Sequence, residues 1–285
     1  MPVYATPKPI LATVELDIGS LRFVAEDRSD TVVDVRPVDA ARPADVKIAQ
    51  QTTVEYADGR LVVAAPKQRP VLGRGGGIEI TVTLPAGSQV EASAGWADVS
   101  SEGRLADCTV TTVSGTVHLD EAGPLWLTTD SGDITASRAH GRTQAASGSG
   151  SLRFHVLEDS AVLRTKQGST TVGDALADLT VDGANGDITV DRAEGSVTAR
   201  TTHGTVRVGE AVRGSLVLEV ASTGSIEIGV REGSTARLHL TSVKGRVHNA
   251  LSETAEPGGA GERVEVRART KHGGIDVRRV PSRAA

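Results

Sequence analysis

Apolar and polar residues alternate along most of the chain, and the alternation restarts at regular intervals behind a glycine. In the segment GDITV, Ile188 and Val190 stand two and four residues after Gly186, with polar residues between them. Alternation with a period of two predicts a β-strand with one buried face. The pattern follows ten anchor glycines: Gly95, Gly115, Gly132, Gly150, Gly168, Gly186, Gly204, Gly224, Gly245 and Gly273. Successive anchors are 17 to 21 residues apart, and the last step is 28.

A second apolar strand precedes each anchor glycine. Its inward residues stand five positions before the glycine: Val90, Val110, Leu127, Ala145, Leu163, Val181, Ala199, Leu240 and Ala268. Before Gly224 the apolar set shifts by one, to Leu216, Leu218 and Val220, which predicts one extra turn residue. Each unit is therefore a strand, a glycine turn and a second strand. Because one unit cannot bury its apolar face alone, we expect successive units to stack in sequence order as the coils of a solenoid.

The fold class that this repeat predicts is all-β. It is a β-solenoid or β-helix of about ten coils of roughly 18 residues, with an N-terminal β cap. Apolar positions fall 2, 4, 7, 11 and 13 residues after the glycine. A left-handed hexapeptide β-helix would carry three equal sub-repeats in each coil instead. The uneven offsets favour a right-handed or flattened solenoid.

The repeats divide the chain into predicted regions. Residues 1–87 form an N-terminal β cap region continuous with the stack, and residues 88–280 form the solenoid repeats. Residues 252–262 are a flexible loop insert, which accounts for the long last step, and residues 281–285 are a tail.

The cap region repeats less regularly but keeps the strand pattern. Leu21 and Phe23 are predicted to point inward. Residues 31–37, 52–66 and 77–85 alternate as strands, and an Ala-Asp-Gly turn joins the middle pair as a hairpin.

Composition agrees with a thin β core. Six aromatic residues and 32 glycines occur in 285 residues, so small branched side chains fill the interior. The formal net charge of −5 argues against general nucleic-acid binding, which needs a basic face. From Arg263 onward the chain carries seven basic and two acidic residues. We interpret this stretch as a solvated last coil, and contact with an anionic partner is the alternative.

The sequence shows no export or membrane signal. Glu15 and Asp17 interrupt the N-terminal apolar stretch, and no apolar run is long enough to span a bilayer. We expect a cytoplasmic chain as written, or an extracellular one if a leader has been removed, without membrane insertion. Cys108 is the single cysteine, which excludes an intrachain disulfide and a thiolate metal cage.

Stacking separates the candidate metal ligands. His203 and His272 each precede an anchor glycine, but sequence order places them three coils apart, roughly 14 Å. Ligands of one metal lie about 2 Å from it, so these two cannot share an ion. Four further histidines occupy different columns: His118, His140, His155 and His239. Asp133 and Asp187 share a column three coils apart, whereas a calcium-binding solenoid repeats its carboxylate in every coil.

Other candidate chemistry is weak. Six residues after the glycine, charges often alternate between coils, at Glu121, Arg138, Val156, Asp174, Arg192 and Glu210. This pattern predicts a surface charge ladder worth roughly 0.2–1 kcal/mol per pair. GRGGG at 73–77 lacks the lysine and spacing of a phosphate loop and is typical of a hairpin connection. Ser149 fits a nucleophile pattern only because its surroundings are rich in serine and glycine. We therefore predict no catalytic, cofactor-binding or metal-ligating residues, and no cofactor.

Several segments together resemble one bacterial protein family. They are the repeated SGDIT-like units, VELDIGSLRF, GRLVVAAP, IEITVTLPAGSQVEASA and the closing KHGGIDVRR. The family consists of β-strand-repeat domains of unknown function, carries the name "putative adhesin", and is related to the head domain of autotransporter adhesins. The likeness spans nearly the whole chain and implies a β-helix-like fold. The family has no established catalytic residues to carry over.

Three functions fit these observations. We expect a non-enzymatic binding or scaffold solenoid of the adhesin type, whose partner is an unknown protein or glycan and not nucleic acid. One alternative is a carbohydrate-active β-helix enzyme, which would need clustered acids and stacking aromatics, and Trp96 and Trp126 are the only tryptophans. The other is a self-assembling filament protein that forms oligomers through its ends or edges.

Overall fold

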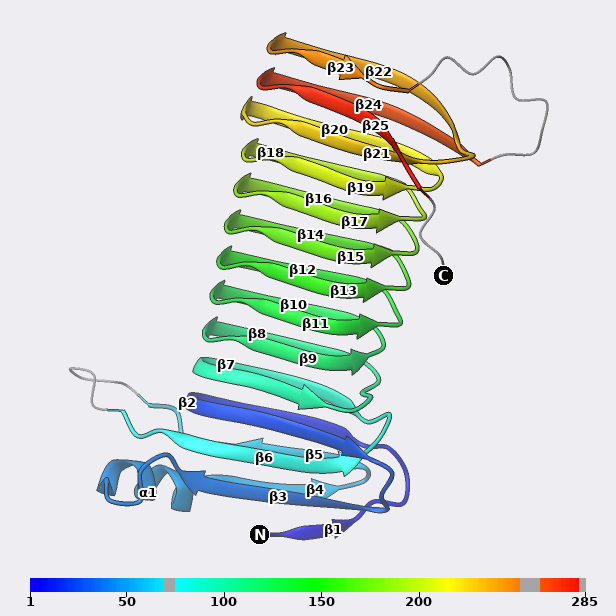
Figure 1. The fold of residues 1–285 in the computed structure, drawn as a ribbon. Helices are drawn as coiled ribbons and strands as arrows, with labels where there is room; N and C mark the ends of the chain where they lie inside the picture. The colour runs from blue at the N-terminus through cyan, green and yellow to red at the C-terminus, as the bar shows by residue number, and fades with distance from the viewer. Residues whose placement is uncertain (69–74, 252–261, 282–285) are drawn as a thin grey trace. The chain divides into compact units, whose positions relative to one another are not determined.

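The computed structural model describes residues 1–68, 75–251 and 262–281, and strands make up nearly all of its regular structure (Figure 1). The chain forms two compact units, Met1–His140 (unit 1) and Gly141–Ala285 (unit 2). Both units contain coils stacked in parallel, and most of these coils have two strands, so the predicted all-β solenoid is confirmed.

Unit 1 holds eleven strands and the one helix of the described residues. They are β1 (Val3–Ala5), β2 (Leu11–Glu26), β3 (Asp30–Pro37), α1 (Pro43–Gln51), β4 (Thr53–Ala57), β5 (Arg60–Ala64), β6 (Ile78–Pro85), β7 (Gln89–Glu102), β8 (Cys108–Ser114), β9 (Val117–Ala122), β10 (Leu125–Ser131) and β11 (Ile134–Ala139).

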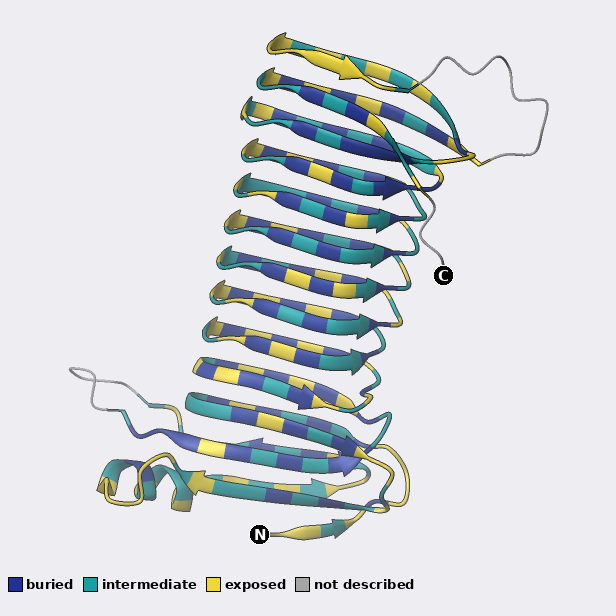
Figure 2. Ribbon diagram, viewed as in Figure 1, coloured by how far each residue is buried: buried dark blue, intermediate teal, exposed yellow. Residues whose placement is uncertain are grey.

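Most of unit 1 is a parallel stack. The β10–β11 coil lies on the β8–β9 coil, because β10 pairs with β8 and β11 pairs with β9. β2 and β7 each run unbroken through a whole coil and pair with each other in parallel. Burial alternates along these strands (Figure 2), and Leu21 and Phe23 are each 1% exposed, as predicted.

The first segment of the chain enters this stack out of sequence order. β2 lies between β7 and a coil made by β5 and β6. On the outer side of that coil, β4 pairs antiparallel with β5, and β3 pairs antiparallel with β6 and with β1. The predicted hairpin is confirmed, with Asp58 and Gly59 in its turn at φ 49° and 77°. Antiparallel strands therefore cover the outer edge of the β5–β6 coil.

The register of β7 differs from the prediction by two residues. Val99, and not Ala97, lies beside Val117. Ala97 thus takes the position that Gly115 occupies in the next coil, while Gly95 lies inside an unbroken strand. A shift of two keeps the same set of residues facing inward, so alternation alone could not reveal it.

Helix α1 is the element that the alternation pattern missed. Pro43 stands in its first turn, where the missing N–H has no intrahelical partner to lose. Asp45 is fully buried, and its carboxylate accepts a hydrogen bond from the Gly77 N–H at 3.1 Å. A Cβ at Gly76 would lie 2.5 Å from the carbonyl oxygen of Ala44, so the glycines after residue 74 allow the chain to pack against the helix.

Unit 2 holds fourteen strands within its described residues. They are β12 (Thr143–Ser149), β13 (Leu152–Leu157), β14 (Ala161–Gln167), β15 (Thr170–Ala175), β16 (Leu179–Asn185), β17 (Ile188–Ala193), β18 (Val197–His203), β19 (Val206–Ala211), β20 (Gly214–Thr223), β21 (Ile226–Arg231), β22 (Thr235–Lys244), β23 (Val247–Asn249), β24 (Arg263–His272) and β25 (Ile275–Val280).

From β12 to β21 the coils stack in sequence order with the predicted columns. Ile188 lies beside Val206, and Leu163 lies beside Val181. All four side chains are at most 1% exposed. The extra turn residue before Gly224 is confirmed, because the register between β18 and β20 shifts there.

The last coil is inserted out of sequence order, which corrects the expectation that each coil lies on the one before it. β24 pairs with β20 on one side and with β22 on the other, and β25 lies likewise between β21 and β23 (Figure 1). The β22–β23 coil, which we call the end coil, is therefore the outermost. Of the predicted loop insert, residues 252–261 lie outside the described residues, as do residues 282–285 of the predicted tail.

The turn geometry explains the anchor glycines. Gly186 has φ 144°, and a Cβ there would lie 2.1 Å from the carbonyl oxygen of Gly168 in the neighbouring coil. Both the backbone conformation and the close approach require a residue without a side chain.

Candidate functional site

Outward side chains of unit 2 form ladders, because equivalent residues of successive coils lie side by side. Arg164, Asp182, Arg200 and Glu219 follow one another in register on β14, β16, β18 and β20. The N···O distances between neighbours are 3.8 to 3.9 Å. Because these side chains are 38% to 66% exposed, each pair contributes less than about 1 kcal/mol. The ladder is a solvent-facing row of alternating charge at a fixed spacing.

The ladder predicted six residues after the glycine is also in register. Asp174, Arg192 and Glu210 lie beside one another on β15, β17 and β19. The Glu210 side chain is 7% exposed and lies between two guanidinium groups, 3.9 Å from Arg192 Nε and 3.6 Å from Arg231 Nε. The register between β19 and β21 shifts at this point, as at a β-bulge. The expectation of a purely surface ladder is therefore wrong at Glu210.

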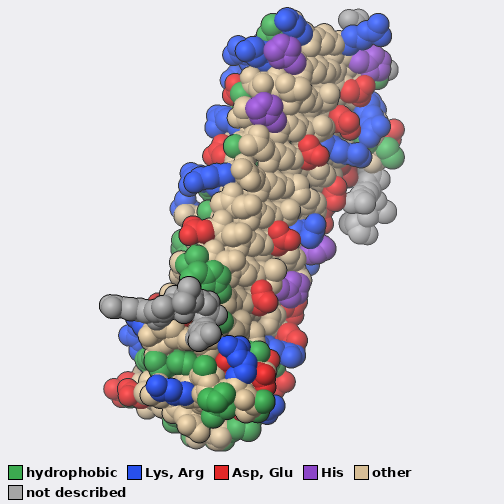
Figure 3. Space-filling view, turned by 90° about the vertical axis from the view of Figure 1, so that its left-hand side faces the viewer, with side chains coloured by type: hydrophobic (Ala, Val, Ile, Leu, Met, Phe, Trp, Pro, Cys, Tyr) green, Lys and Arg blue, Asp and Glu red, His purple; other side chains and the backbone are tan. Residues whose placement is uncertain are grey.

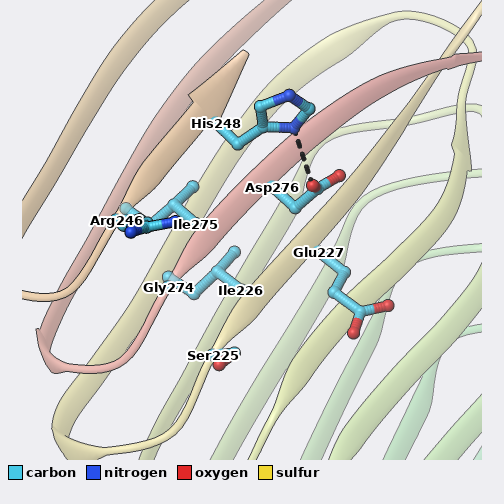
Figure 4. A pocket seen from close by; sticks show the side chains of 8 residues that line it. All are labelled: Ser225, Ile226, Glu227, Arg246, His248, Gly274, Ile275 and Asp276. Atoms are coloured by element: carbon cyan, nitrogen blue, oxygen red, sulfur yellow. Dashed lines mark hydrogen bonds and ion pairs between the residues drawn. The ribbon is translucent and has the colours of Figure 1, made fainter. Parts of the chain in front are cut away.

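A polar hollow of about 250 Å³ lies on unit 2 where the last coil is inserted (Figure 4). Its charged lining comes from Glu227, Arg246, His248 and Asp276. Glu227 and Asp276 are register neighbours on β21 and β25. Each also contacts a basic group: His248 Nδ1 lies 3.0 Å from Asp276, and Arg207 lies 3.8 Å from Glu227. This open, mixed-charge surface offers donors and acceptors to a small polar group of a ligand.

A second hollow of about 380 Å³ lies beside α1 in unit 1. Trp96 and Val38 line it and are 54% and 52% exposed. Ile18 adds apolar surface, while Arg42 and Glu79 supply charge. An exposed indole beside charged groups can contact a ring face and polar groups of a ligand together.

The structure corrects the separation of the two turn histidines. Thr223 lies between His203 and His272 in one column, because β24 is inserted next to β20. The histidines are therefore two coils apart and not three, roughly 10 Å at one strand spacing per coil. The His203 Nδ1–H donates to Asn185 Oδ1 at 3.1 Å, and the His272 Nδ1–H donates to the Ser222 carbonyl oxygen at 3.3 Å.

The remaining titratable candidates are Asp133, Asp187 and Cys108. Asp187 accepts a hydrogen bond from the Thr205 N–H of the next coil at 2.7 Å, while Asp133 belongs to the other unit. Across the described residues, no three His, Cys, Asp or Glu side chains form a group that could hold a metal ion. Cys108 is fully buried, and desolvation raises the pKa of its thiol to about 12, so it is a neutral core side chain near pH 7.

The structure describes Ser149 and part of the glycine-rich segment 73–77. Ser149 is exposed and is the register partner of Gln167 on β14. Gly73 and Arg74 lie outside the described residues, and the Gly77 N–H is already bound to the Asp45 carboxylate. No helix in the described part of the chain has the length and apolar character needed to cross a membrane.

Sequence reasoning predicted the second ladder but missed both hollows. The hollow of unit 2 exists because β25 separates β21 from β23, and this order leaves no mark on the repeat. For the hollow of unit 1 a signal was present: Pro43 followed by Asp45 is typical of a helix first turn.

These features define a class of protein, the parallel β-solenoid with two strands per coil and outward ladders of polar side chains. The Toastrack DUF4097 family matches residues 46–278, and the chain belongs to this family. The family resemblance drawn from the repeated segments is thereby confirmed.

Similar solved structures extend over nearly the whole chain, while no curated protein matches it. A "putative adhesin" from Bacteroides fragilis is 12% identical with a TM-score of 0.34, covering 97% of this chain and 95% of that one. A "putative adhesin" from Parabacteroides distasonis is 12% identical with a TM-score of 0.35, covering 96% of each chain. A "putative lipid binding protein" from the same species is 9% identical with a TM-score of 0.31, covering 98% and 95%.

Proposed function

We propose that this protein is a non-enzymatic binding or scaffold protein that presents rows of polar and charged side chains to a protein or glycan partner. The ladder of Arg164, Asp182, Arg200 and Glu219 carries the proposal. Paired strands hold its members about 4.8 Å apart. Because the row is ordered before binding, a partner with matching groups avoids part of the entropy cost of association.

Charge reversal within the ladder tests this proposal. Wild type and the double variant Asp182→Lys, Glu219→Lys are immobilised and exposed to an array of defined glycans and to bacterial protein extract. We expect at least one ligand to bind the wild type and to be lost from the double variant. The matched control is Lys166→Glu, an exposed substitution on β14 outside this ladder. Failure to retain any ligand, together with turnover of a substrate by the purified chain, would contradict the proposal.

A carbohydrate-active enzyme is the second candidate, favoured by the neighbouring carboxylates of Glu227 and Asp276. Each of them contacts a basic group, so neither is set apart as an acid for leaving-group protonation. Release of reducing sugar from a polysaccharide, abolished by both Glu227→Gln and Asp276→Asn, would establish the enzyme instead.

A further inference from the structure

The end coil of unit 2 has an unpaired strand edge among the described residues. β22 pairs with β24 at nine register positions, and β23 pairs with β25 at three. The described chain supplies neither β22 nor β23 with a strand on the opposite side. Such an edge presents backbone N–H and C=O groups that a further strand can bind.

Apolar side chains of the end coil are incompletely covered. Leu240 is half-buried, whereas Ala268 beside it on β24 is 2% exposed. Val247 is 45% exposed, and Ile275 beside it on β25 is 1% exposed. Val247 and Val243, at 59%, are the large hydrophobic residues that the described part of unit 2 exposes. A strand added to this edge would extend the inward column and bury more of it.

The same edge is basic. Residues 235–249 contain Arg237, Lys244, Arg246 and two histidines, and no aspartate or glutamate. None of these three cations has an ion pair with a described residue. The exposed Arg269 on β24 adds a further positive charge nearby. Figure 3 shows Lys, Arg and His side chains gathered at this end of unit 2.

We propose that the end coil binds an extended acidic segment of a partner protein, which adds to β22 as a further strand. Its apolar residues would cover the column of Leu238 and Leu240, and its alternate acidic residues would lie beside Arg237 and the cations near it. This inference rests on the proposed binding function and names its partner class. Main-chain hydrogen bonds would provide affinity, and the charges would select the partner.

Among the inner coils, Arg200 lies between Asp182 and Glu219 on the strands next to it, so basic and acidic residues alternate in this row. The edge of a second copy would instead place basic residues against basic ones, which disfavours pairing. Charge complementarity therefore selects an acidic strand over a second copy of this chain.

The test uses the full chain and a labelled nine-residue peptide of alternating glutamate and valine. The controls are an alternating lysine and valine peptide, and a glutamate and valine peptide with a central proline, which cannot complete strand pairing. We expect the first peptide to bind and both controls to bind at least about tenfold more weakly. We expect Arg237→Glu with Lys244→Glu to weaken binding by about tenfold or more, and Lys166→Glu to leave it unchanged.

Hydrogen exchange of the wild type locates the peptide without relying on any variant. The proposal predicts that added peptide slows exchange within residues 235–249. Any of four results would overturn the strand-addition proposal. The proline peptide binds as tightly as the first peptide, or an oligothymidine, which tests for nucleic-acid binding, binds more tightly than that peptide. The peptide slows exchange outside residues 235–249, or the free protein forms a dimer in which β22 is already protected. Those outcomes would leave the broader binding function standing, because that function fails only if the chain retains no ligand and turns over a substrate.

Discussion

The outermost coil of unit 1 and the end coil of unit 2 are built alike but covered differently. In unit 1, antiparallel strands β3 and β4 lie on the outer edge of the β5–β6 coil, and Leu61 and Val63 are 0% exposed. In unit 2, the corresponding positions Leu238 and Leu240 of the end coil are half-buried. In these two coils, the inward residues are fully buried only where both edges of the coil are covered. An uncovered coil keeps apolar surface and backbone groups available for a partner.

The largest expected difference is between truncations in these two coils. Leu61→Ala should lower the free energy of unfolding of unit 1 by about 3 kcal/mol, because it leaves a cavity in a closed core. Leu240→Ala should cost unit 2 only about 1 kcal/mol, because that side chain is already partly in water. Native-state hydrogen exchange measures each unit separately. Equal losses from the two truncations would contradict the comparison.

A smaller difference in stability is expected between replacing a buried acidic side chain, Glu210, and an exposed one, Glu219. Glu210→Gln should destabilise unit 2 by about 2 kcal/mol, because it leaves Arg192 and Arg231 without their shared carboxylate in a confined position. Glu219→Gln in the exposed ladder should cost less than about 0.5 kcal/mol. Chemical denaturation of the two variants checks the order, and a larger loss for Glu219→Gln would reverse the interpretation.

The stability of the two units should also respond differently to pH. Burial raises the pKa of the Cys108 thiol in unit 1 from 9.0 to about 12, so folding favours the neutral thiol. This contribution is fully present below pH 9 and is lost as the pH rises toward 12. Unit 1 should therefore lose about 1 kcal/mol of stability per pH unit in that window. Hydrogen exchange of wild type and Cys108→Ala between pH 8 and 11 measures it, and the substitution should not alter the pH response of unit 2.

The repeat in the sequence predicted which residues face inward but not the order of the coils at the ends. Inward columns and the turn shift before Gly224 were predictable, because alternation and glycine spacing specify them locally. Coil order at the ends was not, because Leu218, Ala268 and Leu240 stand at equivalent inward positions. Any of their strands could lie on any other, so the repeat does not say which coils are neighbours.

The candidate sites were likewise predictable only where the repeat itself specifies them. The charges at Arg192 and Glu210 could be paired from their common offset after the glycine, but the burial of Glu210 depends on a bulge and on Arg231. The hollow beside Glu227 and Asp276 required the inserted coil, and the uncovered edge required knowing which coil is outermost. Both were inaccessible to a pattern that treats every coil as equivalent.

Residue-resolved hydrogen exchange along β22 and β24 tests whether the outer edge of the end coil is open. In a strand paired on one side, alternate N–H groups point away from the neighbour. The structure predicts alternating fast and slow exchange along β22 of the free protein and uniformly slow exchange along β24. Uniformly slow exchange along β22 would show that its outer edge is already paired and would contradict the account.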